Sequence, residues 1–459
     1  MIASSLFLSP GLIVVKLLAS TARCHPTVLT AMKISTQHIP GLVIHQHRFS
    51  LPLDYAHPTA KISVFARELV APEKADAALP YLLFFQGGPG SGSPRPVGNS
   101  GWIKRALQEF RVLLLDQRGT GASSPITAQT MRHFATPEAQ ADYLQHFRAD
   151  NIVRDAEAIR HTLIGDAAWS ILGQSFGGFC AMNYLSAAPH GLKEVLITGG
   201  IPSLTRTADE LYRATYPRVI AKNRAYYERY PADVAQVKNI VRHLQENQVQ
   251  LAGGERLSAE RFLQLGLAFG MSDGYELVHY LIEEAFVESP NGREMNRNFL
   301  QHFEQSQSFD SHPIYSLLQE ACYTQRLASD WSAERVLAEF PAFAHTNAGA
   351  LLFTGEMIYP WMFEQYSQLQ PLQGAAHILA KKTDWPMLYD VAALKNNRVP
   401  MAAVVYFDDM YVPREFSEET AAIVPNIKLW ITNQYEHNGL RADGEAVVDR
   451  LLGMVRGRL

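Results

Sequence analysis

Residues 173–178 read Gly-Gln-Ser-Phe-Gly-Gly, which places a serine at the centre of a glycine-rich turn. An apolar run at 169–172 precedes this segment, and a helical pattern that we expect to begin near Phe179 follows it. A sharp strand-to-helix turn needs glycines because neighbouring chains crowd it, and it holds the serine hydroxyl out at the sheet edge. The G-x-S-x-G pattern alone also occurs in plain turns, but the flanking strand and helix favour Ser175 as a nucleophile.

A serine hydroxyl becomes a good nucleophile when a base takes its proton and a carboxylate orients that base. In this architecture the acid and then the histidine follow the serine, each after a late strand. Asp409 follows an apolar run at 402–407, and His437, one of sixteen histidines, follows the last predicted strand. We prefer Asp409 to the adjacent Asp408 because the Met-Tyr-Val-Pro that follows places Asp409 at the turn. The sequence therefore predicts a triad of Ser175, Asp409 and His437.

The oxyanion formed in such a reaction needs backbone N–H donors. One should be the amide of Phe176, directly after the nucleophile. The other should come from the Gln-Gly-Gly-Pro-Gly loop at 86–90, where we favour Gly88, with Gly87 close behind. A plain turn does not explain so many glycines near one strand end. A nucleotide-binding loop fits poorly, because Pro89 interrupts it and no acidic residue follows at a ribose-binding distance.

The elements that must position these residues are visible as apolar runs in the first two hundred residues. Four runs lack alternation, which indicates strands buried on both faces of a parallel sheet; they lie at 81–85, 111–115, 169–172 and 195–198. Helical spacing fills the segments between them, and alternating patterns at 43–53 and 61–70 predict a meander of strands before them. The predicted fold class is α/β, a mostly parallel central sheet flanked by helices.

The pattern changes after residue 200. Helical segments dominate up to about residue 400, for example at 209–229, 232–248 and 276–288. Sheet character returns at 401–407 and 427–432, before a closing helix at 444–456. We therefore expect an α/β core made of residues 32–200 and 401–459, with residues 201–400 inserted as a helical cap.

Residues 1–31 are predicted to be an N-terminal extension of doubtful status. Their apolar stretch is interrupted by polar residues, Pro10 and Gly11, and no basic residue precedes it, so it fits neither a membrane span nor a typical signal peptide. We expect a cytoplasmic protein, with export through residues 1–31 as the alternative.

Composition excludes several classes of protein. The 459 residues are 47% hydrophobic and 19% charged, which is unlike a disordered chain. Lysine and arginine number 41 against 45 acidic residues, so the basic excess expected of a nucleic-acid-binding protein is missing. Three cysteines without a CxxC pair, and no HExxH motif, argue against a disulfide framework or a zinc site. We expect no metal, no cofactor, no nucleic acid and no membrane partner.

Together, four motifs resemble those of the proline iminopeptidases, serine peptidases of the α/β-hydrolase fold. They are Gln-Gly-Gly-Pro-Gly at 86–90, Asp-Gln-Arg-Gly-Thr-Gly at 116–121, the serine turn at 173–178 and Glu-His-Asn-Gly at 436–439. The segments at 331–335 and 353–357 are similar to cap motifs of the larger bacterial branch. The resemblance runs from about residue 40 to the C-terminus. Gln86 departs from it, because many family members have histidine there, which puts substrate detail in doubt more than the reaction.

The resemblance implies an enzyme that releases proline from peptides with a free N-terminal proline, through an acyl-enzyme. A charged imino nitrogen in a buried pocket needs a carboxylate partner. Glu320 and Glu356, cap acids that precede aromatic runs, are the candidates, although each fits an ordinary surface or helix-terminal acid equally well. Tyr359, Trp361 and Phe363 are candidates for the walls of a proline pocket, or simply for core.

Two other functions stay open. The same triad would serve an esterase, a less selective aminopeptidase or a tripeptidyl peptidase, which would not need a free imino group. A non-catalytic binding protein on this scaffold would not need a complete set of Ser175, Asp409 and His437, so it fits less well. The oligomeric state is not predicted.

Overall fold

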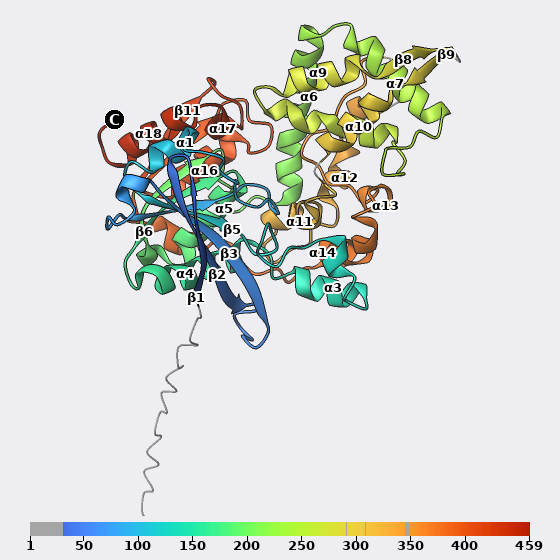
Figure 1. Cartoon of the computed structure of the whole chain (residues 1–459). Coiled ribbons are helices and arrows are strands. Elements are labelled where there is room, and N and C mark those ends of the chain that lie inside the picture. Colours follow the sequence, from blue (N-terminus) through green and yellow to red (C-terminus); the bar gives the residue numbers. More distant parts are fainter. Residues whose placement is uncertain (1–30, 291, 308, 345–348) are drawn as a thin grey trace, which may run out of the picture.

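The computed structural model describes residues 31–290, 292–307, 309–344 and 349–459 (Figure 1). The predicted N-terminal extension therefore lies outside the described residues, apart from Ala31, which begins the first strand. Among the described residues, we find no helix with both the length and the apolar character that a membrane crossing requires.

Nine strands of the described chain form one sheet in the order β1-β2-β3-β5-β4-β6-β7-β10-β11. Their bounds are β1 Ala31–Ile39, β2 Leu42–Pro52, β3 Lys61–Val70, β4 Tyr81–Phe85, β5 Arg111–Asp116, β6 Trp169–Gln174, β7 Leu192–Thr198, β10 Met401–Tyr406 and β11 Ile427–Thr432. The meander β1-β2-β3 and its junction with β5 are antiparallel, and every pairing from β5 to β11 is parallel. The predicted mostly parallel α/β sheet is confirmed.

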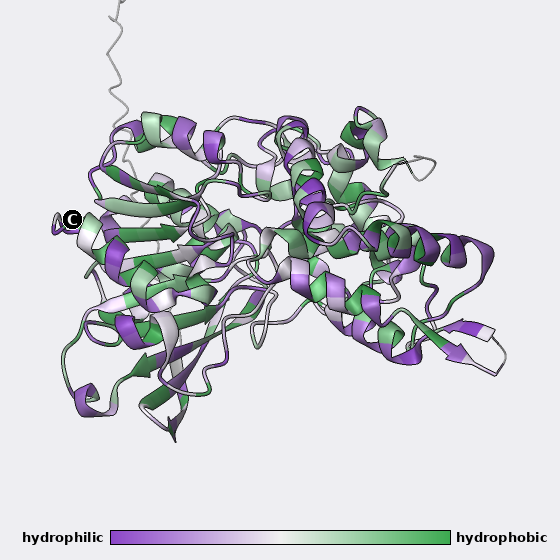
Figure 2. Cartoon of the chain, turned by 90° about the horizontal axis from the view of Figure 1, so that it is seen from above, coloured by the Kyte–Doolittle hydropathy of each residue, from purple (hydrophilic) through white to green (hydrophobic). Residues whose placement is uncertain are grey.

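Helices cover both faces of this sheet, as its unalternating strands require. In the described chain outside residues 201–400, the helices are α1 Gly101–Ala106, α2 Ala128–Met131, α3 Pro137–Leu144, α4 Ala149–Ile164, α5 Phe176–Ala187, α16 Arg414–Ile423, α17 Gly439–Ala442 and α18 Gly444–Val455. Leu83 and Phe85 of β4 pack in the apolar core that includes α4 and α5, whereas Leu82 and Phe84 pack in a second core with α1 and α18. Figure 2 shows the hydrophobic residues concentrated on the central strands.

Residues 201–400 are mostly helical and lie to one side of the sheet (Figure 1). Their helices are α6 Ala208–Arg229, α7 Asp233–Glu246, α8 Ala259–Leu263, α9 Gly274–Glu283, α10 Arg297–Ser306, α11 Pro313–Leu318, α12 Ser332–Leu337, α13 Met362–Gln365, α14 Gln373–Lys381 and α15 Val391–Lys395, with the 3-10 helix η3 at Gln264–Gly270. We propose that this segment is the inserted cap and call it the cap below. Helix α3, from the preceding segment, packs against α14 of the cap.

One cap element differs from the sequence prediction. The helix expected at 276–288 ends at Glu283, and Phe286–Ser289 forms strand β8, which pairs with β9 at Gly292–Met295. Pro290 cannot continue a helix, and Gly292 adopts a φ of +105°, which suits the hairpin between the two strands. Phe286 and Val287 fit a short strand as well as a helix, so the sequence pattern alone extends the predicted helix beyond its observed end.

Candidate active site

Ser175 occupies the turn between β6 and α5 with φ 53° and ψ −122°. Glycines make this conformation possible by letting backbones approach closely. A Cβ at Gly177 would lie 2.0 Å from the carbonyl oxygen of Phe85, and a Cβ at Gly200 would lie 2.1 Å from that of Ser175. Helix α5 begins at Phe176, earlier than the predicted start near Phe179, because the glycines after the serine hide the first helical turn from a propensity argument.

The structure brings Ser175, His437 and Asp409 into one hydrogen-bonded chain. The Nε2 atom of His437 lies 2.8 Å from the Ser175 Oγ, and its Nδ1 lies 2.7 Å from the Asp409 Oδ2. The Asp409 Oδ1 accepts backbone N–H bonds from Tyr411 at 2.9 Å and Val412 at 3.1 Å. Asp408 points to solvent. Of the two adjacent carboxylates, Asp409 is therefore the one placed to orient His437.

Electrostatics around His437 favour its acceptance of a proton. Burial lowers the pKa of the imidazole, but the charge and hydrogen bond of Asp409, together with the nearby Glu356 and Glu436, raise that pKa above its ordinary value overall. The buried carboxylate of Asp409, with an exposed fraction of 1%, is stabilised by the two N–H groups of the following turn. The arrangement can deprotonate a hydroxyl and hold the resulting imidazolium in place.

The glycine loop at 86–90 lies directly beside the serine. A Cβ on Gly87 would be 3.1 Å from the Cβ of Ser175, and Gly88 has a φ of +125° that favours glycine. Phe176 is the first residue of α5, a position whose N–H has no acceptor within its own helix. Gly88 lines the same cavity as Ser175, and Phe176 directly follows the serine, so both predicted donor positions lie near the nucleophile.

Residues of the Asp-Gln-Arg-Gly-Thr-Gly motif at 116–121 hold the glycine loop in place by hydrogen bonds. The Gln117 Nε2 donates to the carbonyl oxygen of Gln86 at 3.0 Å. The two carboxylate oxygens of Asp116 accept the N–H groups of Ser93 and Ala122 and form an ion pair with Arg95 at 2.7 Å. These bonds tie the glycine loop to the end of β5, as expected of a motif that supports the site without taking part in chemistry.

Ser175 and His437 face a cavity of about 1,130 Å³ between the sheet edge and the cap. Buried and half-buried side chains from the cap and from the loop after β10 line the part of the cavity that we call its inner end: Gln264, Phe309, Tyr315, Glu356 and Tyr411. The Tyr315 hydroxyl donates to the Glu356 Oε1 at 2.5 Å. Burial raises the pKa of Glu356 from 4.5 to about 7, against the opposing effects of Tyr315 and His437. The inner end therefore presents one acid, Glu356, among aromatic rings and neutral polar groups.

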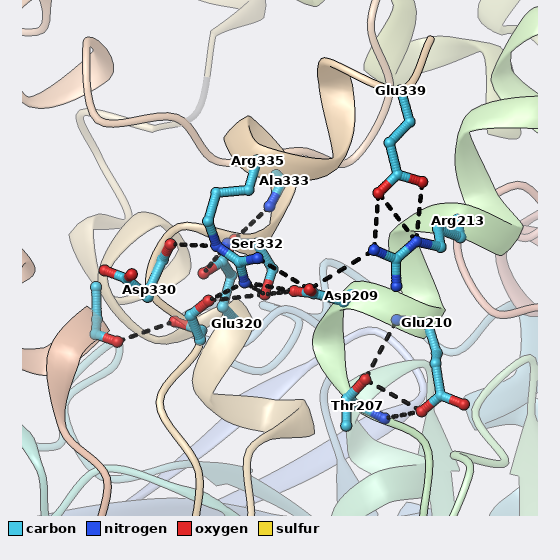
Figure 3. Close-up of polar contacts among 12 residues, drawn as sticks. Thr207, Asp209, Glu210, Arg213, Glu320, Asp330, Ser332, Ala333, Arg335 and Glu339 are labelled. Carbon is cyan, nitrogen blue, oxygen red and sulfur yellow. Dashed lines mark hydrogen bonds and ion pairs between the residues drawn. The ribbon is translucent and has the colours of Figure 1, made fainter.

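Glu320, the other cap acid predicted to bind substrate, does not line this cavity. Its Oε1 accepts the N–H of Ala333 at 2.9 Å and its Oε2 that of Ser332 at 3.2 Å, at the start of α12 (Figure 3). Arg335, from the same helix, pairs with Asp209 of α6 beside it. The prediction for Glu320 is corrected, because its carboxylate satisfies a helix N-terminus.

The predicted aromatic pocket walls are also structural. Tyr359 is buried with its hydroxyl 3.1 Å from that of Tyr216, and Phe363 packs against Trp331. Neither Tyr359, Trp361 nor Phe363 lines the cavity. Cys180 is fully buried on α5, and burial raises the pKa of its thiol, which agrees with a packing role.

Several residues around the site were missed by the sequence reasoning. Lys222 of α6 forms an ion pair with Glu436, the neighbour of His437, at 2.6 Å, and the His437 N–H donates to the carbonyl oxygen of Gly270 in the cap. The ring of Tyr411 lies edge-on to the imidazole at 4.8 Å between centroids. Tyr411 lies two residues after Asp409 in the sequence, which was a signal that it could lie at the site. No local sequence pattern indicated such a position for Lys222.

Comparison with known proteins places the chain in a family. A model of the alpha/beta hydrolase fold matches residues 80–307. The chain is 51% identical to a proline iminopeptidase of Aeromonas sobria, over 91% of this chain and 98% of that protein. It is 37% identical to the proline iminopeptidase aneH of Aspergillus aculeatus, over 90% and 93%. A solved proline iminopeptidase of Mycobacterium smegmatis aligns at 14% identity and a TM-score of 0.41, over 93% of this chain and 100% of that chain. This chain belongs to the proline iminopeptidases of the α/β-hydrolase fold.

Proposed function

We propose that this protein is a serine aminopeptidase that releases proline from peptides with a free N-terminal proline. The observation that carries the proposal is the hydrogen-bonded chain from Ser175 through His437 to Asp409, at 2.8 and 2.7 Å, facing a cavity whose inner end holds Glu356. Family membership at 51% identity supports the same substrate class.

In the first half of the reaction, the Ser175 Oγ attacks the carbonyl carbon of the N-terminal residue while His437 Nε2 takes the hydroxyl proton. The N–H groups of Gly88 and Phe176 stabilise the oxyanion, each by about 3 kcal/mol in comparable sites. The intermediate collapses with cleavage of the C–N bond, and His437 returns the proton to the leaving amine. Water then attacks the prolyl ester of Ser175 with His437 again as the base, which releases proline.

In this scheme, Glu356 is the reason why the substrate needs a free N-terminus. A protonated imino nitrogen at the inner end would be a buried charge, which is tolerated only beside an opposite charge. Burial holds the pKa of Glu356 at about 7, so the carboxyl is largely ionised above neutral pH and ready to pair with the cation. An N-acylated peptide has no such charge and leaves the ionised carboxylate without an opposite charge to pair with.

The test is kcat/KM on the 4-nitroanilides of proline, alanine and N-acetylproline, with the full chain and with Ser175→Ala. We expect strong preference for the free prolyl substrate, loss of activity on acetylation, and loss of turnover in the variant. Comparable rates on the acetylated substrate would overturn the aminopeptidase assignment and favour an esterase or endopeptidase. Retained turnover in Ser175→Ala would overturn the role of the serine.

A further inference from the structure

The cavity is larger than release of a single proline requires. At about 1,130 Å³ it lies at the upper limit of pockets that enclose a whole drug-sized ligand. In the proposed reaction, the inner end of the cavity, at Glu356 and Tyr315, binds only the N-terminal residue of the peptide. The rest of the cavity extends past Ser175 to a part of the molecule for which the proposed reaction, as described above, gives no role.

This remaining part, which we call the outer section, lies between the cap and the core. Four residues of α9 line it, Leu277, Val278, Tyr280 and Leu281, together with Glu284 directly after the helix. The core contributes Trp102 and Ile103 of α1, which line the same cavity. Apolar side chains from two separate parts of the fold therefore border the route from Ser175 to solvent.

Packing in the main core accounts for only some of the apolar residues of α9. Val278 and Ile282 are buried in that core, although Val278 also borders the cavity, and Leu281 packs partly against it. Leu277 and Tyr280, in contrast, have exposed fractions of 54% and 61% while lining the cavity. Helix α9 thus presents a second apolar surface toward the cavity, and that surface has no partner within the described chain large enough to bury it.

Charged groups at the rim of the outer section are already paired with one another. Glu284 accepts from His302 of α10 at 3.0 Å, and Arg441 forms an ion pair with Asp273 at 2.8 Å. A bound molecule would therefore meet carboxylates that already have partners, around an apolar surface. This chemistry suits burial of apolar side chains better than recognition of a charged group.

We propose that the outer section binds the first residues after the scissile bond and selects peptides with a large apolar residue there. The inference rests on the proposed function, which fixes the direction of the substrate. With the imino group at Glu356 and the carbonyl carbon at Ser175, the remaining chain has to run outward. At about 3.3 Å per residue of extended chain, two or three residues span about 10 Å along α9. The substrate class is therefore peptides of three or more residues that begin Pro-Leu, Pro-Phe or Pro-Met.

The test compares Pro-Leu-Gly amide with Pro-Ser-Gly amide, by release of proline, and uses prolinamide as a substrate without a following residue. We expect kcat/KM to favour the leucine peptide by about tenfold, since burial of one aliphatic side chain has that scale. In the double variant Leu277→Ser, Tyr280→Ser this ratio should fall to within twofold. The loss on Pro-Leu-Gly amide should exceed any loss on prolinamide at least fivefold.

Leu327→Ser is the matched control, because Leu327 is a cap leucine with an exposed fraction of 51% that does not line the cavity. Its leucine-to-serine ratio should equal that of the unchanged chain. A ratio near one in the unchanged chain, or an unaltered ratio in the double variant, would overturn the proposal. So would a lower molar mass of the double variant than of the unchanged chain in light scattering, with the peptide preference retained, because the face would then be a contact with a second copy. Failure to cleave any of the three substrates would instead overturn the proposed function.

Discussion

The two walls of the active-site cavity are built on different principles. On the core wall, backbone bonds at strand ends position the reactive groups: the Ser175 N–H donates to the carbonyl oxygen of Thr198 at 2.9 Å, and Asp409 accepts two N–H groups of its own turn. On the cap wall, side chains position one another, as the Tyr315 hydroxyl does for Glu356. The core wall thus depends on the fold of the sheet, and the cap wall on the identity of a few side chains. We expect changes on the first wall to abolish the reaction and changes on the second to alter its selectivity.

Substitution on the core wall should have the largest effect. Ser175→Ala removes the nucleophile and should lower kcat on the prolyl anilide by roughly 10⁶-fold, as removal of a triad serine does elsewhere. The thermal midpoint should stay within about 2 °C, because the methyl group fits where the Cβ already lies. Steady-state kinetics and circular dichroism measure the two quantities. A loss of only tenfold would mean that the core wall is not the site of covalent chemistry.

Substitution of the acid on the cap wall should change recognition and pH dependence. Glu356→Gln should lower kcat/KM on the prolyl anilide about 100-fold, the scale of losing one partner of a buried ion pair. In the unchanged chain both Glu356, with a pKa of about 7, and His437, whose pKa is raised, gain protons as the pH falls. On the acid side of the pH profile, log kcat/KM should therefore rise with a slope approaching two in the unchanged chain. In Glu356→Gln the slope should be one. Equal slopes would contradict the role of Glu356.

Burial raises the pKa of both cap acids, but only the Glu320 carboxylate accepts two buried N–H groups of α12, so the two acids should differ in sign when stability is measured. The pKa of Glu356 rises from 4.5 to about 7 on folding, so ionisation opposes folding as the pH rises through this range. Glu356→Gln should raise the free energy of unfolding at pH 8 by up to about 3 kcal/mol and give no gain near pH 4.5. Glu320→Ala should lower it by about 2 kcal/mol at pH 8, because two buried N–H groups of α12 lose their acceptor.

Urea unfolding at the two pH values measures both changes. The same preparations should show kcat/KM for the prolyl anilide within about twofold of the unchanged chain for Glu320→Ala. A stabilising Glu320→Ala, or a destabilising Glu356→Gln at pH 8, would remove the distinction between the structural acid and the binding acid.

We expect the smallest effect on activity from a substitution at the contact between the cap and the loop that carries His437. Lys222→Met removes the ion pair that joins α6 to Glu436, beside His437, and should lower kcat about fivefold by loosening the histidine loop. Burial already raises the pKa of Glu436, so it should take up a proton more readily without Lys222 and alter the acid limb of the pH profile. Arg229→Met, which removes an exposed ion pair between the same helix and Glu276, is the control. It should leave kcat and the acid limb of the pH profile unchanged.

The difference between the walls also explains what the sequence could predict. Ser175, Asp409 and His437 each follow a strand, so their meeting at one sheet edge follows from chain order and the parallel fold. Glu320 and Glu356 both precede aromatic residues in the cap, and only tertiary packing separates the one that serves α12 from the one that faces the cavity. Lys222 lies far from His437 in sequence, and no period or turn signal connects the two.

The place where the chain leaves and rejoins the sheet has a consequence for biosynthesis. Strands β7 and β10 are neighbours, although about 200 residues lie between them in the chain. Closing a loop of that length costs about 5 kcal/mol before the strand pairing compensates for it. Ser175 precedes this long excursion, and Asp409 and His437 follow it. A nascent chain therefore carries its nucleophile without acid or base until synthesis is nearly complete, so the unfinished peptidase stays inert beside the free N-termini of other new proteins.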